Sequence, residues 1–167
     1  MKKTLTLATL GALAVAGAIA FTTFSIAQSE GDAVAPLAQQ AASADAAKQI
    51  TIWRDANCGC CDSYAEYLVA HGYQVTRVDD PGFATRSVAA GVPEQGIGCH
   101  LAEVDGYYVS GLVPVEIIER LVAERPAIQG ITLPGMPPNA PGMAREKTGT
   151  LKTYAFNDGE VSVYSNE

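Results

Sequence analysis

Three of the four cysteines in this chain stand within four residues, in the run CGCC at 58–61. Cys58 and Cys61 have the i, i+3 spacing of a dithiol, and the helical pattern that follows places them at a helix N-terminus. The unpaired N–H groups and partial positive charge of a helix N-terminus favour the thiolate form of cysteine. Such thiols exchange with disulfides or bind soft metal ions. Cys60 has no place in that pair, and it cannot easily join Cys61 because adjacent cysteines make a strained disulfide.

The alternative for the same residues is purely structural. Four cysteines allow three pairings into two disulfides, which would suit an exported protein. A structural disulfide usually closes a long loop, because short loops remove less entropy from the unfolded chain. Three cysteines in four residues are poorly arranged for that purpose. The crowding therefore favours a site with chemistry over a pair of structural disulfides.

The segments around the cluster alternate between the patterns of strands and helices. Residues 49–54 alternate and are rich in β-branched side chains, so we predict a strand that runs directly into CGCC. A helix over 61–72 follows, with Tyr64 and Tyr67 at helical spacing. The further predicted elements are a strand at 73–80, a short helix at 81–91, strands at 99–104 and 107–113 joined by Asp105-Gly106, an amphipathic helix at 113–126, a Pro- and Gly-rich loop at 127–149, and a closing hairpin at 153–158 and 161–165.

This order predicts an α/β domain with a thioredoxin-like fold, in which a central mixed sheet is flanked by helices. In that fold a loop that usually holds a cis-proline packs against the dithiol, in front of the third core strand. Here the loop over 96–100 reads GIGCH, so Cys99 and His100 stand where the proline would be. We therefore predict that a fourth thiol and an imidazole face the CGCC run. Soft thiolate ligands favour Cu(I) first and Zn(II) second, and crowded thiolates can bridge several Cu(I) ions.

Met136 and Met143 lie seven residues apart in the loop PGMPPNAPGM. Apart from Met1 they are the only methionines, and methionine that fills a core usually sits on a helix or strand with apolar neighbours. Exported copper proteins use thioether ligands because these stay useful where thiols oxidise. The two residues are therefore candidate copper ligands. The alternative is a turn-rich cover that packs the methionines over the site.

The N-terminal region differs in composition from the rest of the chain. Lys2 and Lys3 precede an uncharged, mostly apolar run over 4–29 with a small-x-small tripeptide at 25–27, which predicts a signal peptide at 1–27. An uncleaved membrane anchor is the alternative. The following segment, 28–48, is rich in Ala, Gln and Ser and is predicted to be a flexible linker. Residues 49–167 suit one domain with one core.

Acidic residues outnumber basic residues in this chain. It holds 18 Asp and Glu against 11 Lys and Arg. Cleavage of the signal would remove two of the basic residues and none of the acidic ones. This balance argues against nucleic acid and against anionic membrane surfaces as partners. We expect no membrane contact after signal cleavage.

Several motifs occur together between about residues 49 and 165. They are a strand leading into CGCC, Cys99-His100 before the hairpin VDGYYVSGLVP, the helix end ERP and the loop PGMPPNAPGM. This combination resembles the CopG-type family of periplasmic copper-resistance proteins, long filed as a domain of unknown function. The resemblance implies a thioredoxin-like fold, a periplasmic location and a place in copper tolerance. The copper ligands that it implies are Cys58, Cys60, Cys61, Cys99 and His100, with Met136 and Met143 as further ligands.

The leading hypothesis is therefore a periplasmic protein that holds one or several Cu(I) ions at the cysteine site, with interconversion of Cu(I) and Cu(II) as an extension. Its expected partners are copper ions and other periplasmic copper-handling proteins. Two alternatives stay open: a thiol–disulfide oxidoreductase in which Cys58 attacks and Cys61 resolves, and an exported domain stapled by disulfides without chemistry. Cys60, Cys99 and the missing proline argue against the oxidoreductase. Whether the protein is an enzyme is left open by the sequence.

Overall fold

The computed structural model describes residues 48–167. The described residues do not include the predicted signal peptide at 1–27. Of the predicted linker at 28–48 they include only Lys48. No helix within the described part of the chain is long and apolar enough to cross a membrane. The elements are β1 (Gln49–Arg54), α2 (Gly59–Ala70), β2 (Gln74–Asp79), α3 (Phe83–Ala89), the 3-10 helix η1 (Glu94–Gly96), β3 (His100–Val104), β4 (Tyr107–Ser110), α4 (Val115–Glu124), β5 (Gly130–Thr132), β6 (Lys152–Asn157) and β7 (Glu160–Asn166).

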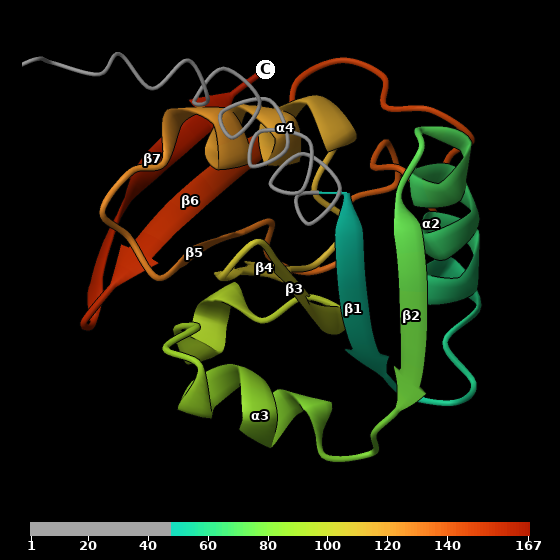
Figure 1. The fold of residues 1–167 in the computed structure, drawn as a ribbon, viewed down its shortest axis with the longest axis horizontal. Helices are drawn as coiled ribbons and strands as arrows, with labels where there is room; N and C mark the ends of the chain where they lie inside the picture. The colour runs from blue at the N-terminus through green and yellow to red at the C-terminus, as the bar shows by residue number, and fades with distance from the viewer. Residues whose placement is uncertain (1–47) are drawn as a thin grey trace, which may run out of the picture. The chain divides into compact units, whose positions relative to one another are not determined.

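The strands form one seven-stranded sheet in the order β2-β1-β3-β4-β5-β6-β7. β1 pairs with β2 and β4 pairs with β5 in parallel, and the other neighbours are antiparallel. Figure 1 shows α4 above the strands, α3 below them and α2 beside β1 and β2. The predicted mixed sheet with flanking helices and a C-terminal hairpin is therefore confirmed.

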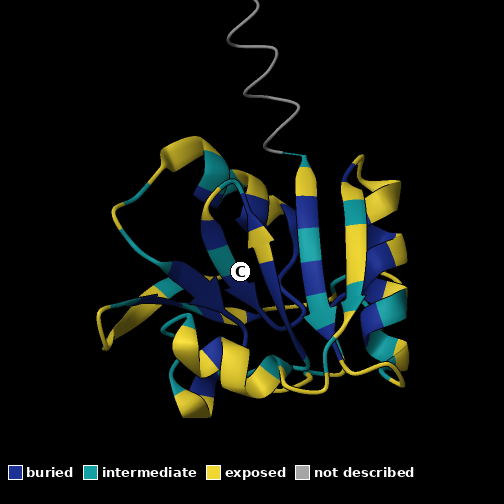
Figure 2. Cartoon of the chain, turned by 60° about the horizontal axis from the view of Figure 1, so that its bottom comes forward, coloured by how far each residue is buried: buried dark blue, intermediate teal, exposed yellow. Residues whose placement is uncertain are grey.

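Side chains alternate between the two faces of the sheet, as the period of a strand requires. Ile50 and Ile52 of β1 are buried in the main core with residues of α2 and α4. Leu101 of β3 points to the other face, where it packs with Val92 and Phe156 in a smaller cluster. Figure 2 shows the central strands buried and the outer sides of the helices exposed. The two faces of the sheet thus carry separate apolar cores.

The prediction of an uninterrupted loop at 127–149 is wrong at Gly130–Thr132, which forms β5. All three residues are buried, and the strand pairs with β4 on one side and β6 on the other. A strand of three residues is too short to show alternation in the sequence, so its neighbours rather than its own pattern define it. Gly130 suits this place because an added Cβ would lie 2.1 Å from the Tyr108 carbonyl oxygen. Residues 133–149 remain a loop, as predicted, and are called the methionine loop below.

Two loops are joined beside the end of β4. Gly98 forms an isolated parallel bridge with Gly135, and the Gly98 N–H donates to Ser110 Oγ at 3.0 Å. Gly98 immediately precedes Cys99, and Gly135 immediately precedes Met136. The sheet therefore holds these two sulfur-bearing residues on neighbouring segments, although the segments are far apart in the sequence.

We expect Gly98→Ala to lower the free energy of unfolding by about 1–3 kcal/mol, the usual result of overpacking a close contact. An added Cβ would lie 2.3 Å from Gly111 Cα, a backbone atom that cannot rotate away. Urea denaturation of the reduced protein measures the change. Gly59→Ala is the control, because no atom of residues 48–167 lies within 4 Å of an added Cβ at that position. Equal midpoints for G98A and the parent would contradict this close packing.

Candidate metal centre

α2 begins at the cysteine run, as predicted. Cys58 is its N-cap residue, and the Cys58 carbonyl accepts from the N–H groups of Cys61 at 3.1 Å and Asp62 at 3.2 Å. Helices usually begin with Ser, Thr, Asp or Asn, whose side-chain oxygen binds a free N–H and contributes about 1 kcal/mol. The Cys58 side chain makes no such capping bond. This position therefore serves the thiol rather than the stability of the helix.

Four sulfur atoms come together at this end of α2. The Sγ atoms of Cys58, Cys60, Cys61 and Cys99 all lie within 4.8 Å of one another. Cys58 and Cys61 form a disulfide, while Cys60 and Cys99 are free thiols. Cys60 Sγ lies 3.3 Å from Cys58 Sγ, so the third thiol of the run sits beside the disulfide. The structure also brings in Cys99, which is 38 residues away from Cys61 in the sequence.

His100, the first residue of β3, lies next to this cluster. Its side chain is fully buried, with Nδ1 3.4 Å from Cys99 Sγ and the ring centre 4.9 Å from that of Tyr64. Burial lowers the pKa of His100 to about 3, so the imidazole is neutral near pH 7 and keeps a lone pair for a metal ion. If Nδ1 offers that lone pair to the cluster, the proton stays on Nε2, which finds no hydrogen-bond partner among the described residues.

The Cys99 thiol is harder to ionise than an ordinary cysteine. Burial raises its pKa, and the neighbouring Cys60 raises it further. Cys99 therefore keeps its proton near pH 7 in the metal-free protein. Because the thiolate is the form that ligates metals, an ion that binds here must displace this proton. The site consequently favours soft ions, which bind thiolate strongly.

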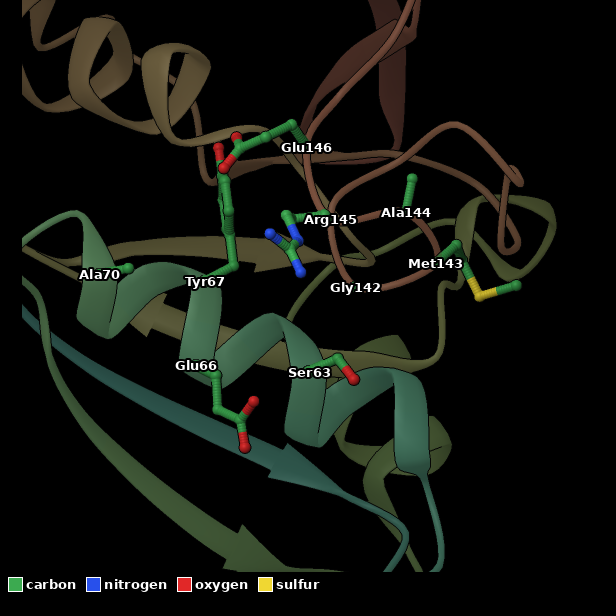
Figure 3. Close-up of a pocket in the computed structure, with 9 residues that line it drawn as sticks. All are labelled: Ser63, Glu66, Tyr67, Ala70, Gly142, Met143, Ala144, Arg145 and Glu146. Carbon is green, nitrogen blue, oxygen red and sulfur yellow. The ribbon is translucent and has the colours of Figure 1, made fainter.

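The structure places the two loop methionines differently. Met136 Sδ lies 3.8 Å from Cys60 Sγ, which adds a thioether to the sulfur cluster. Met143 lines a neighbouring cleft of about 520 Å³ between α2 and the methionine loop. Figure 3 shows it toward the N-terminal end of α2, where Gly142 packs so closely that an added Cβ would lie 2.7 Å from the Cys60 carbonyl oxygen. Met136 is thus within reach of the cluster, and Met143 lies on the rim of the adjoining cleft.

Sequence reasoning assigns Tyr64 to the helix but does not identify it as part of the site. The residue is fully buried, and its hydroxyl donates to the Val113 carbonyl at 2.6 Å. Burial raises its pKa well above the usual value, so the ring is neutral and packs against His100. Its only signal in the sequence is a spacing of four residues from Cys60, which puts both on one side of the helix. That spacing alone does not distinguish a site residue from a core residue.

Similarity to known proteins covers this site. Residues 97–143 match the family described as "Protein of unknown function, DUF411", a span that contains Cys99, His100 and both methionines of the loop. Two solved structures, forms 2 and 1 of "Copper resistance protein copG", are each 33% identical to the chain. Each match covers 71% of this chain and 97% or 96% of the solved chain, with TM-scores of 0.65 and 0.64. No curated protein matches the chain.

We expect the stability of the metal-free protein to decrease as the pH is lowered, because of His100. Its folded pKa of about 3 lies below the ordinary 6.5, so the unfolded chain binds the proton more readily between these values. Stability that is fully present above pH 6.5 is then lost as the pH falls toward 3. Between pH 6.5 and 5 the loss amounts to about 1.5 kcal/mol.

Urea denaturation across this pH range measures the effect, and His100→Gln should lack this part of the slope. The variant also corrects for the carboxylates, which titrate in both proteins. If H100Q keeps the pH dependence of the parent, His100 is not held neutral by burial.

Proposed function

Because the chain belongs to the CopG-type family of copper resistance proteins, we propose that it holds Cu(I) at the cysteine cluster and serves copper tolerance. A copper-related role is supported by the family together with the cluster itself. We further propose that this happens in the periplasm, which rests on the signal peptide predicted at 1–27. The observation that carries the proposal is the meeting of four cysteine sulfurs within 4.8 Å of one another.

The donor atoms suit a soft ion. Cu(I) binds thiolate and thioether sulfur, whereas a structural Zn(II) site is complete with four ligands in a tetrahedron. The donors here are four cysteine sulfurs, a thioether from Met136 beside Cys60 and an imidazole beside Cys99. This set is larger than one tetrahedron needs. It fits several Cu(I) ions bridged by shared thiolates, with the four cysteines and His100 as the main ligands.

The disulfide and the proposed copper site use the same sulfur atoms. Cys58 and Cys61 cannot ligate as thiolates while they are joined, so full copper binding requires the reduced protein. Closing this disulfide from two thiols releases two electrons and two protons, which is enough to reduce two Cu(II) ions to Cu(I). Cys60 and Cys99 remain free in the oxidised state and can retain the Cu(I) that forms. Interconversion of Cu(I) and Cu(II) is therefore part of the proposed function.

A thiol–disulfide oxidoreductase is the second candidate, because the Cys58–Cys61 disulfide lies at the N-terminus of α2. Such an enzyme needs one attacking and one resolving thiol. It has no use for a third thiol 3.3 Å from the first, or for a half-buried fourth thiol of raised pKa. A purely structural role has less support, since Cys60 and Cys99 do not form the second disulfide that it requires.

Cys60→Ser distinguishes the two active candidates. We expect it to weaken Cu(I) binding at least about tenfold. Replacing a residue that only hydrogen-bonds to a metal ligand typically lowers metal affinity about tenfold or more, and Cys60 is itself a proposed ligand. Competition titration of the reduced protein against a Cu(I) chelator measures binding, and reduction of a model protein disulfide measures thiol exchange. The parent should be weak in the exchange assay, and C60S no weaker. Strong exchange activity in the parent, with unchanged copper binding in C60S, would favour the oxidoreductase.

Met136→Leu and Met143→Leu are a matched pair of variants. Both side chains lie in the methionine loop and are about half exposed, at 55% and 46%, and leucine preserves most of their volume. Because Met136 lies within reach of Cys60, M136L should weaken Cu(I) binding about tenfold, and M143L by less than about threefold. The same competition titration compares them. Similar losses in both variants would contradict the assignment of Met136 as the nearer ligand.

A further inference from the structure

Arg54 occupies a place that the pattern of β1 reserves for an apolar side chain. Ile50 and Ile52 point into the main core, and Arg54 is the next residue on the same face of the strand. Its side chain is only 10% exposed. A buried guanidinium keeps its charge and is unfavourable unless carboxylates and carbonyls surround it. Core packing alone therefore does not explain an arginine at this position.

Residues 55–62 form the turn that carries Cys58, Cys60 and Cys61, here called the cysteine turn. The guanidinium of Arg54 joins both ends of this turn. Its Nη1 donates to the main-chain carbonyl of Asp55 at 2.9 Å, and the same oxygen accepts the Cys58 N–H at 3.0 Å. Its Nη2 donates to Asp62 Oδ1 at 3.0 Å, in the first turn of α2. Asp79, at the end of β2, is a third partner at 3.3 Å. One side chain thus links Asp55, the first residue of the turn, to Asp62 at its other end.

Arg54 also lies beside the other half of the cluster. It pairs with His100 across β1 and β3, and directly opposed residues of antiparallel strands point to the same face of the sheet. His100 in turn approaches Cys99. Arg54, which holds the start of α2, therefore lies beside the end of β3 that carries His100 and Cys99.

The contact between Arg54 and Asp62 supports the start of α2, which has no side-chain cap at Cys58. Asp62 instead brings a carboxylate into the first turn, where the helix dipole favours negative charge. Arg54 and Arg77 both donate to the same oxygen of Asp62 at 3.0 Å. They differ in setting: the Arg77 side chain is 47% exposed, whereas Arg54 is buried and also holds the Asp55 carbonyl.

We propose that Arg54 is a positioning residue for the cysteine cluster, which fixes the turn over 55–62 so that its three thiols meet Cys99. The effect on ligand binding rests on the proposed copper function, whereas the effect on the turn does not. Without Arg54 the Asp55 carbonyl loses its guanidinium and Asp62 keeps only the exposed Arg77. No side chain then joins the two ends of the turn, and the thiols must be ordered when the metal binds. Without Arg77 the turn stays fixed, because Arg54 still holds Asp62.

Arg54→Met and Arg77→Met test this as a matched pair, since each removes one guanidinium bonded to the same oxygen at the same distance. Amide hydrogen exchange of the reduced, metal-free chain reports on the turn. R54M should speed exchange of the Cys58, Cys61 and Asp62 amides at least about tenfold, while R77M stays within about threefold of the parent. Unchanged rates in R54M, or equal increases in both variants, would overturn the proposal.

Cu(I) competition titration is the second readout. R54M should bind Cu(I) at least about tenfold more weakly than R77M, and equal affinities would overturn the proposal. Arg54→Lys keeps the charge but cannot bridge Asp55 and Asp62 as a fork, so R54K should resemble R54M in both assays. Full recovery in R54K would overturn positioning in favour of charge alone. A parent that binds no Cu(I) would refute the proposed function, while the exchange rates would still decide the role of Arg54.

Asp62→Asn provides the test if R54M does not fold. It keeps the shape of the side chain and removes the charge that Arg54 and Arg77 both hold. D62N should speed exchange of the Cys61 amide at least about tenfold, with Glu66→Gln, one turn further along α2, as the control. Exchange in D62N at the rate of the parent, or of E66Q, would overturn the proposal.

Discussion

The contact between the start of α2 and the start of β3 determines whether this chain has a sulfur cluster at all. The thiols come from two segments, and they share a volume in which no two sulfurs are more than 4.8 Å apart. β1 is the element that both segments have in common. It leads into the cysteine turn at one end, and it pairs with β3 in the register that sets Arg54 opposite His100. A change in that register would separate the two halves of the site.

Placing the cluster at a helix start has a consequence for stability. Cys58 occupies the position at which other helices carry a capping oxygen, so α2 forgoes about 1 kcal/mol of local stabilisation. Asp62 compensates from the first turn, where its charge is favoured by the helix dipole and held by two arginines. The chemistry of the thiol and the stability of the helix are thus separated onto different residues of one turn.

Burial shapes the chemistry of the metal-free centre. Cys99 is held protonated and His100 is held neutral, so the inner part of the site carries little charge and can be buried without a partner ion. Thiolate appears there only together with a cation that replaces the proton. Disulfide formation between Cys58 and Cys61 competes for the same sulfurs. Oxidation, protonation and the proposed metal binding are therefore alternatives at one small set of atoms.

Much of the architecture has a local origin and could be predicted. The alternation of β1, the apolar stripe of α4 and the helical start at Cys58 all depend on near neighbours in the sequence, which pattern reasoning captures. The meeting of Cys99 with the CGCC run was also predicted, because the order of strands and helices pointed to a known arrangement of loops.

Other features depend on segments that meet only when the sheet has formed. β5 escaped prediction because its three residues are defined by β4 and β6 on either side. The sequence made Met136 and Met143 equal candidates, and only the structure shows that Met136 approaches Cys60. That approach follows from the bridge between Gly98 and Gly135, which leaves no periodic trace in the sequence. The same holds for Arg54, whose charge in an apolar row has meaning only once Asp55 and Asp62 are placed around it. Periodicity is a property of neighbours along the chain, whereas these contacts depend on strand order and register, which are set by the packing of the whole sheet.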